Sequence, residues 1–555
     1  MSHETDALLR RRDDSSLSHH PAPRGPFVRA VVLAVGALVL SAVLYATAAT
    51  PSSWKKTVKI LGHTHSSSDP LSILFDETLD GKELFYEQQT LDHLSNDEDA
   101  KKTWSHRYYK ISKHFRGPGH PIIMVIGGED ALTGPLHPFI EEGMASKFGA
   151  FVIEPEHRFY GKSTPVENAS VHDYIKYLSP DQALLDAIQL LQTTRQTLGC
   201  SLDRSSPFYC PAISVGASYP GFLSAMLRYV YADFVDMSFA ASAPIRLYSQ
   251  TNDANAYYDK VSEVAEQMSP GCANAVRSTM EAVQDTVLSS NWTVSEAAAN
   301  LGFCPNDLPE YIQDLDTLVS EGVVYMLPAI FADFNMFSYP PGPQTPNVMA
   351  CNVFQNDNLT PLEKIQGFFE LRGLVEYGET VECFDLGLEL PTGPNARIMG
   401  SDWSGSGGGK TGEIWEFQCC KDLIIRSGYS NTSMFIPREW TYEWHDEHCR
   451  QRFPGITLNS FRLEQKWHFD QLAGASRIVF TNGMNDGWSA AGSFLEDVND
   501  SVVAITIADG AHHSDLGGKY PDEKDTDAVK EAQVQVMSIL EQWLEEIYAT
   551  QSYNI

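Results

Sequence analysis

ISVGASYPGF, residues 213–222, joins an apolar run to a helical one through a turn that carries Ser218 between small residues. The run FYCPAISVGAS predicts a buried strand, and the residues after the turn have helical spacing. A sharp turn of the form Gly-x-Ser-x-Gly is one way to present a nucleophilic serine. Here Pro220 takes the second glycine position, and Gly221 follows one place late. We expect Pro220 to be tolerated in the first turn of a helix, where the N–H that it lacks would have no helical partner.

Further apolar runs occur on both sides of that turn. They are PIIMVIGGED (121–130), AFVIEPEHRFYG (150–161), VDMSFAASAP (235–244), SRIVFTNG (476–483) and SVVAITIADGAHH (501–513). Buried strands that alternate with helices predict an α/β fold with a mostly parallel sheet. In such a sheet, active sites gather at the carboxyl ends of the strands. The candidate residues named below all follow such ends.

The composition limits the partners that this chain can have. Its 555 residues are 43% hydrophobic, which is ample for a large core. Lys and Arg total 40 against 72 Asp and Glu, a formal net charge of −32, so we expect no nucleic-acid partner. No pattern calls for a cofactor. The sequence does not give the oligomeric state and leaves a homodimer open.

Two short stretches imitate ligand-binding motifs. SGSGGGKTG (404–412) nearly matches a phosphate loop, but Ser404 stands where the first glycine is required and no apolar strand leads into it. HDEHC (445–449) contains histidines and a cysteine without a second cluster of ligands at useful spacing. We therefore expect a flexible loop, no metal site, and Cys449 in a disulfide.

The composition also divides the chain along its length. Residues 30–49 are uncharged and about long enough to cross a bilayer, and the excess of arginine before them favours a cytosolic tail. A cleaved signal peptide is the alternative, because Ala46-Thr47-Ala48 resembles a cleavage site. The expected organisation is a tail (1–29), an anchor or signal peptide (30–49), a linker (50–80), an α/β domain in two parts (81–250 and 466–550) and a mainly helical cap insertion (251–465) between the parts.

Sequons and cysteines indicate a lumenal or extracellular body. Asn-x-Ser/Thr sequons begin at Asn168, Asn291, Asn358, Asn431 and Asn499. All nine cysteines lie between Cys200 and Cys449, where an oxidising compartment would pair most of them and leave at least one outside a disulfide. An acidic dileucine pattern at Glu4–Leu9 is typical of membrane proteins sorted to an endosome or vacuole. We expect a vacuole- or lysosome-like compartment or secretion.

The loops after the last two apolar runs supply partners for Ser218. A catalytic serine needs a base within hydrogen-bond reach and a third group that orients the base, and in α/β-hydrolases the chain order is Ser, acid, His. Asp486 follows one late run, and His512 and His513 follow the next. A serine in a glycine turn is by itself usually structural, but this ordered set makes Ser218 a candidate nucleophile. The residues alone do not separate the two histidines.

Longer motifs carry a resemblance to a known family. They are YEQQTLDHL (86–94), RYY (107–109), GGED (127–130), EHRFYGKSTP (156–165), YLSPDQALLD (177–186), GASYPG (216–221), WEFQCC (415–420), TNGMNDGW (481–488) and GAHHSDL (510–516). Over about residues 84–545 the chain resembles the serine peptidases that include lysosomal prolylcarboxypeptidase, dipeptidyl peptidase II and thymus-specific serine peptidase. The family turn Gly-x-Ser-Tyr-x-Gly is matched by Gly216–Gly221. The usual Asp-Pro-Trp is replaced by Asp486-Gly487-Trp488, a departure in the loop of the acid.

The resemblance implies an α/β-hydrolase fold with a large helical cap and assigns the catalytic roles. Ser218 corresponds to the nucleophile, Asp486 to the orienting acid and His512, the first of the two histidines, to the base. The oxyanion hole would be made by the backbone N–H of Tyr219 and a donor at Gly128.

Two further residues are expected to contact the substrate. Glu129 could hold the free amino end of a peptide, with an ordinary surface carboxylate as the equal alternative. Trp488 could line the apolar, aromatic slot that proline requires.

The predicted function is that of a serine exopeptidase that cleaves peptides after proline through an acyl-enzyme. A dipeptidyl-peptidase mode and a carboxypeptidase mode both remain open. The other hypotheses are an esterase or lipase on the same fold and an inactive hydrolase-fold binding protein.

Overall fold

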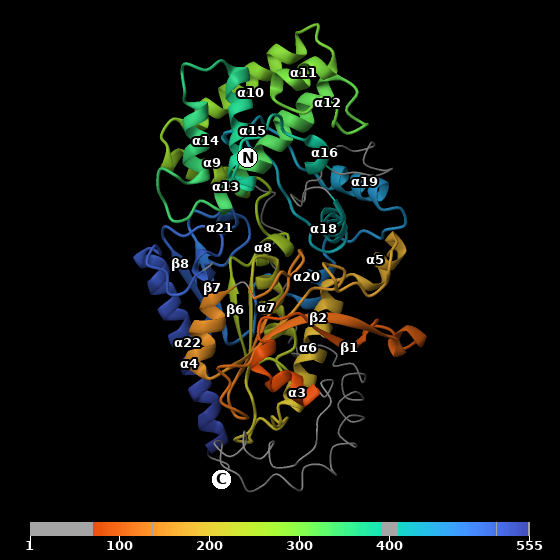
Figure 1. The fold of residues 1–555 in the computed structure, drawn as a ribbon, viewed down its shortest axis with the longest axis vertical. Helices are drawn as coiled ribbons and strands as arrows, with labels where there is room; N and C mark the ends of the chain where they lie inside the picture. The colour runs from red at the N-terminus through yellow and green to blue at the C-terminus, as the bar shows by residue number, and fades with distance from the viewer. Residues whose placement is uncertain (1–69, 136, 391–408, 518, 553–555) are drawn as a thin grey trace, which may run out of the picture. The chain divides into compact units, whose positions relative to one another are not determined.

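The computed structural model describes residues 70–135, 137–390, 409–517 and 519–552 (Figure 1). The expected tail, the anchor or signal segment and most of the linker lie outside the described residues. So does the start of the SGSGGGKTG stretch. The described residues all belong to one compact unit, His65–Ile555.

An eight-stranded sheet forms the centre of this unit. Its strands are β1 (Leu84–Thr90), β2 (Thr103–Ile111), β3 (Ile122–Val125), β4 (Phe151–Pro155), β5 (Ala212–Ala217), β6 (Met237–Ala241), β7 (Ile478–Gly483) and β8 (Val502–Ile507). They lie in the order β1-β2-β4-β3-β5-β6-β7-β8. β2 is antiparallel to both of its neighbours, and all the other pairs are parallel. The predicted α/β fold with a mostly parallel sheet is confirmed.

Both faces of the sheet are covered, because alternate residues of a strand point to opposite sides. In β3, Ile122 and Met124 belong to a core with α6 (Pro180–Thr197) and α7 (Tyr219–Val230). Ile123 and Val125 belong to a core with α4 (Ala145–Phe148) and α22 (Asp527–Ser552). Figure 1 shows α4 and α22 on one side of the sheet and α6 on the other. With the serine turn directly after β5, this is the α/β-hydrolase architecture.

The residues between β6 and β7 form helices. They are α8 (Ile245–Tyr248), α9 (Ala256–Met268), α10 (Cys272–Leu288), α11 (Val294–Leu301), α12 (Leu315–Val319), η5 (Ser320–Tyr325), α13 (Met326–Met336), α14 (Pro346–Phe354), α15 (Pro361–Tyr377), α16 (Leu386–Glu389), α18 (Gly409–Lys421), α19 (Tyr442–Arg452) and α20 (Arg462–Trp467). Helices α9 to α15, which we call the cap, share a hydrophobic core of their own and form one group in Figure 1. Trp415 of α18 and Trp467 of α20 belong instead to the core that covers the sheet.

Short elements complete the fold. They are α3 (Pro70–Phe75), η2 (Glu77–Leu79), η3 (Glu98–Lys101), η4 (Phe139–Met144), α5 (Val171–Tyr177), α21 (Gly487–Ala491) and η6 (Ser514–Leu516). Among the described residues, one helical run, Leu315–Met336, is long and apolar enough to cross a membrane. In its most apolar window, 67% of the residues are buried within the protein, and its side chains belong to the core of the cap.

Four disulfides link cysteines that are 10 to 79 residues apart in the sequence. They join Cys200 to Cys210, Cys272 to Cys351, Cys304 to Cys383 and Cys420 to Cys449. Cys419 stays outside these disulfides and is buried. The expectations that most cysteines pair, that at least one does not and that Cys449 is in a disulfide are confirmed. The asparagines of all five sequons are exposed.

Candidate active site

Ser218 lies in a strained turn between β5 and α7. Its backbone has φ 58° and ψ −129°, a conformation that residues other than glycine rarely adopt. Neighbouring side chains must be small: a Cβ at position 216 would lie 2.1 Å from the carbonyl oxygen of Pro220, and one at position 221 would lie 2.9 Å from that of Ala241. The half-buried Ser218 is therefore presented at the carboxyl edge of the sheet, as the Gly-x-Ser-Tyr-x-Gly pattern predicts.

Pro220 links this turn to the loop after β3. It is the second residue of α7, so the expectation that it lies in the first helical turn is confirmed. Its ring packs against Gly128, where a Cβ would lie only 2.6 Å from the proline Cγ. The N–H of Tyr219 belongs to the first turn of α7, whose N–H groups have no carbonyl partner within the helix. Gly128 and Tyr219 thus lie close to each other beside Ser218.

Asp486 and His512 meet at the ends of β7 and β8. Both are buried, with exposed fractions of 1% and 9%. The Nδ1 atom of His512 lies 2.6 Å from Oδ2 of Asp486, and Oδ1 of Asp486 accepts the N–H of Trp488 at 3.0 Å. Both carboxylate oxygens are therefore engaged, and the Nε2 atom of His512 is left for another partner.

The loops after β5 to β8 are joined by hydrogen bonds. Ser218 donates its N–H to Ala241 at 2.9 Å, and the hydroxyl of Ser242 accepts the N–H of His513 at 2.9 Å. Within the described part of the chain, no hydrogen bond runs from the Ser218 hydroxyl to His512. Such bonds are often long before substrate binds and shorten in the complex.

The two histidines have different environments. Only His512 contacts Asp486. Burial, together with the charges of His512 and His137, holds the pKa of His513 well below its usual range. The structure therefore distinguishes His512, which contacts the acid, from His513, whereas the spacing of the residues alone does not.

Glu129 interacts electrostatically with His512 and with a group of tyrosines. It is half-buried, and desolvation raises its pKa to about 7, while the charge of His512 opposes that rise. Its charge in turn acts on the buried phenols of Tyr160, Tyr219 and Tyr248. A pKa near 7 is not that of an ordinary surface carboxylate.

Trp488 stands beside the base. Its ring centroid lies 6.5 Å from that of His512 and 4.3 Å from that of Tyr257, which belongs to α9 of the cap. Trp488 is half-buried. The candidate site therefore has an aromatic wall formed by Trp488 of α21 and Tyr257 of the cap.

The matching family explains this combination of elements. The model of the serine carboxypeptidase S28 family matches residues 89–535. The chain belongs to this family. It is therefore a serine peptidase, and the resemblance that the motifs carry is confirmed.

Curated relatives of this S28 peptidase match over most of their length. The lysosomal Pro-X carboxypeptidase of Pongo abelii is 25% identical over 491 residues, 87% of this chain and 92% of the relative. The prolyl carboxy peptidase like protein 5 of Caenorhabditis elegans is 29% identical over 470 residues, 79% and 86% of the two chains. Among solved structures, the proline iminopeptidase of Mycobacterium smegmatis is 12% identical, with a TM-score of 0.32 over 80% of this chain and 96% of that one.

In this S28 peptidase, motifs far apart in the sequence converge on the side chain of Tyr219. Its hydroxyl accepts a hydrogen bond from Gln418 at 3.0 Å and lies 3.0 Å from Nε2 of His157. Burial lowers the pKa of His157 to about 4, so the ring is neutral; its Nδ1 faces the carbonyl oxygen of Arg158 at 2.8 Å and donates to it, which leaves Nε2 to accept a hydrogen bond from the Tyr219 hydroxyl. Tyr160 donates to Gln418 at 2.6 Å, and Trp415 packs against the ring of Tyr219. The family motifs contain these residues, but their spacing gave no sign that they hold Tyr219.

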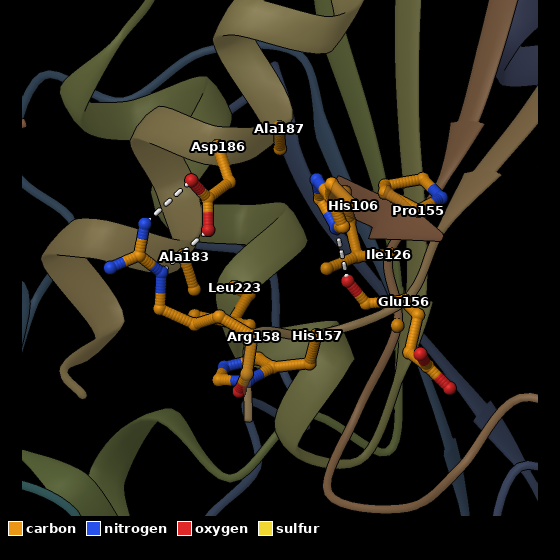
Figure 2. Close-up of a pocket in the computed structure, with 11 residues that line it drawn as sticks. His106, Ile126, Pro155, Glu156, His157, Arg158, Ala183, Asp186, Ala187 and Leu223 are labelled. Carbon is orange, nitrogen blue, oxygen red and sulfur yellow. Dashed lines mark hydrogen bonds and ion pairs between the residues drawn. The ribbon is translucent and has the colours of Figure 1, made fainter. Parts of the chain in front are cut away.

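A small pocket lies where the loops after β3 and β4 meet (Figure 2). Buried polar groups line it: Arg158 forms an ion pair with Asp186 at 2.6 Å, and His106 lies 2.5 Å from the carbonyl oxygen of Glu156. The carboxylate of Glu156 accepts the N–H of Leu132 at 2.9 Å. This network fastens the loop that carries Gly128 and Glu129. None of the candidate catalytic residues lines the pocket.

Proposed function

We propose that this S28 peptidase cleaves the peptide bond that follows a proline near one end of a peptide, with Ser218, His512 and Asp486 as its triad. The contact that carries the proposal is the 2.6 Å bond between His512 and Asp486. The segment Ala241–Ser242 links it to the strained serine turn, since it accepts the N–H of Ser218 and the N–H of His513. The preference for proline is inferred from the relatives, two of which are named for Pro-X or prolyl carboxypeptidase activity.

In the proposed mechanism, Oγ of Ser218 attacks the carbonyl carbon while Nε2 of His512 takes its proton. Asp486 holds the Nδ1–H of the base and stabilises the imidazolium that forms. The N–H groups of Tyr219 and Gly128 bind the oxyanion. His512 then gives the proton to the leaving amine, and water hydrolyses the ester on Ser218 by the same steps in reverse.

The proline side chain requires a slot without charge. Its ring has no N–H and is compact, so shape and apolar contact must select it. The face of Trp488, held against Tyr257 of the cap and close to His512, offers such a surface. We place the proline ring there.

Digestion of a mixed peptide library tests the specificity. We expect the residue before the cut to be strongly enriched in proline, and the cut to lie one or two residues from an end. Mass spectrometry of the products gives both quantities, and peptides blocked at one end show which terminus is needed. A product set without enrichment of proline before the cut would contradict the proposed slot while leaving the serine mechanism intact.

The end of the peptide that is recognised has two candidates. The charges that act on Glu129 come from His512 and Asp130, and an ionised Glu129 would pair with a free amino group. That arrangement favours release of an Xaa-Pro dipeptide. The names of the relatives favour the other end, with release of the residue after proline.

The pKa of Glu129 yields a pH test of the amino-end mode. With a pKa of about 7, only about 1% of this carboxyl is ionised at pH 5. The substrate amino group stays charged to about pH 7.5, so KM for free-amino Xaa-Pro reporters should fall as the pH rises from 5 to 7. We expect Glu129→Gln to abolish this fall and the neighbouring Asp130→Asn to keep it. An identical fall for N-acetylated reporters would exclude pairing with the amino end.

We also propose that the body lies in a lumen or outside the cell. Four disulfides and five exposed sequon asparagines support that location. Endoglycosidase treatment of the native protein should lower its apparent mass on a gel, and an unchanged band would contradict glycosylation.

A further inference from the structure

A side chain of the cap holds the loop that carries Asp486. Asn335, near the end of α13, is fully buried. Its Nδ2 donates to the carbonyl oxygen of Asn485 at 2.8 Å, and its Oδ1 accepts the N–H of Gly487 at 2.8 Å. One amide thus grips the backbone immediately before and immediately after Asp486.

The rest of this loop is also packed against the cap. The ring of Trp488 lies against Tyr257, and Ala491 belongs to the hydrophobic core of the cap. A Cβ at position 487 would lie 2.7 Å from the ring of Tyr257, so only glycine fits there without a shift. The segment after β7 is therefore packed against the cap, while the N–H groups of Met484 and Asn485 bond to the end of β8 and the loop after it.

Gly487 explains both why Asn335 can bond to this loop and why the loop needs these hydrogen bonds. A proline at this position would have no N–H to donate to Asn335. Glycine supplies the N–H but has the greatest backbone freedom of any residue, which by itself would let the loop vary. The two hydrogen bonds of Asn335 remove that freedom at the place where the carboxylate must be aimed.

We propose that Asn335 is a positioning residue for catalysis: through the backbone on both sides of Asp486, it aims the carboxylate at Nδ1 of His512. The inference rests on the proposed role of Asp486 as the orienting acid. It makes the cap part of the catalytic machinery, because α13 supplies the two side-chain hydrogen bonds on either side of the acid.

The first test compares two buried asparagines of the cap. Asn335→Ala should lower kcat by roughly 10- to 100-fold, the range expected when a catalytic group is displaced by about 1 Å, with KM within about threefold. The matched control is Asn347→Ala. Asn347 of α14 is equally buried, and its side-chain amide has no hydrogen-bond partner among the described residues. We expect Asn347→Ala to keep kcat within about twofold. Equal losses of kcat in the two variants would overturn the proposal.

A conservative variant and a spectroscopic readout separate positioning from folding. Asn335→Asp keeps the acceptor for Gly487 and, protonated as its full burial beside Asp486 favours, can still donate to Asn485, so kcat should fall between wild type and Asn335→Ala. Proton NMR of histidine-labelled protein should show a far-downfield Nδ1–H signal for His512 that broadens or shifts in Asn335→Ala and stays in place in Asn347→Ala. An unmoved signal in Asn335→Ala, in protein with an unchanged melting temperature, would also overturn the proposal.

Asp486→Asn tells the two failures apart. If this variant keeps full activity, the proposed triad is wrong and the role of Asn335 falls with it. If Asp486→Asn is inactive while Asn335→Ala is fully active, the triad stands and the inference about Asn335 is wrong.

Discussion

Ser218→Ala is expected to remove nearly all peptidase activity, with kcat falling by several orders of magnitude. The hydroxyl is the only atom of the strained turn that can form the acyl-enzyme in the proposed mechanism, and loss of a triad member typically has an effect of this size. The fold should be unchanged, since Ser218 is half-buried and its hydroxyl makes no hydrogen bond among the described residues. The measurement is kcat on an Xaa-Pro reporter together with the melting temperature.

Covalent labelling by a fluorophosphonate probe checks the same residue directly. Wild-type protein should be labelled and Ser218→Ala should not. Ser489→Ala is the matched control, because Ser489 is a buried serine of the neighbouring α21 whose hydroxyl has no hydrogen-bond partner among the described residues. Labelling that persists in Ser218→Ala and disappears in Ser489→Ala would refute the assignment of the nucleophile.

The second large effect concerns the paired histidines. His512→Ala should lower kcat by several orders of magnitude, because it removes both the base and the partner of Asp486. His513→Ala should lower kcat by no more than about tenfold. Burial keeps the ring of His513 neutral, and its backbone N–H, which bonds to Ser242, remains in the variant.

Single-turnover kinetics on the two variants give the comparison. Formation of the acyl-enzyme should be almost absent in His512→Ala and retained in His513→Ala. Because His512 is buried and His513 is half-buried, melting temperatures must accompany the rates. A greater loss of acylation in a folded His513→Ala than in His512→Ala would show that the base has been assigned to the wrong histidine.

Six of the eight strands could be predicted from the sequence. β3 to β7 are buried almost throughout, β8 is partly exposed, and each of the six lies within one of the apolar runs of the sequence. β1 and β2 carry charged residues and gave no such run. In β2, Arg107 pairs with Glu156 and Lys110 with Asp80 at 2.6 Å, so these side chains are buried by ion pairs that a strand pattern does not show.

The residue types of the candidate site could be predicted from short stretches of sequence, but the contacts between those residues could not. The need for a small residue at Gly216 is local, because a Cβ there would meet the carbonyl oxygen of Pro220, whereas the Cβ missing at Gly221 would meet Ala241 after β6. The order of Ser218, Asp486 and His512 could be predicted for a similar reason: each follows directly on the end of its own strand.

Only the tertiary structure decided which groups meet. It paired His512 rather than His513 with Asp486, and it desolvated Glu129 enough to raise its pKa to about 7. It also brought Asn335 onto the loop of the acid, across 150 residues of chain from Asn485. Contacts of this kind depend on how the cap packs against the end of the sheet, and no local spacing in the sequence encodes that packing.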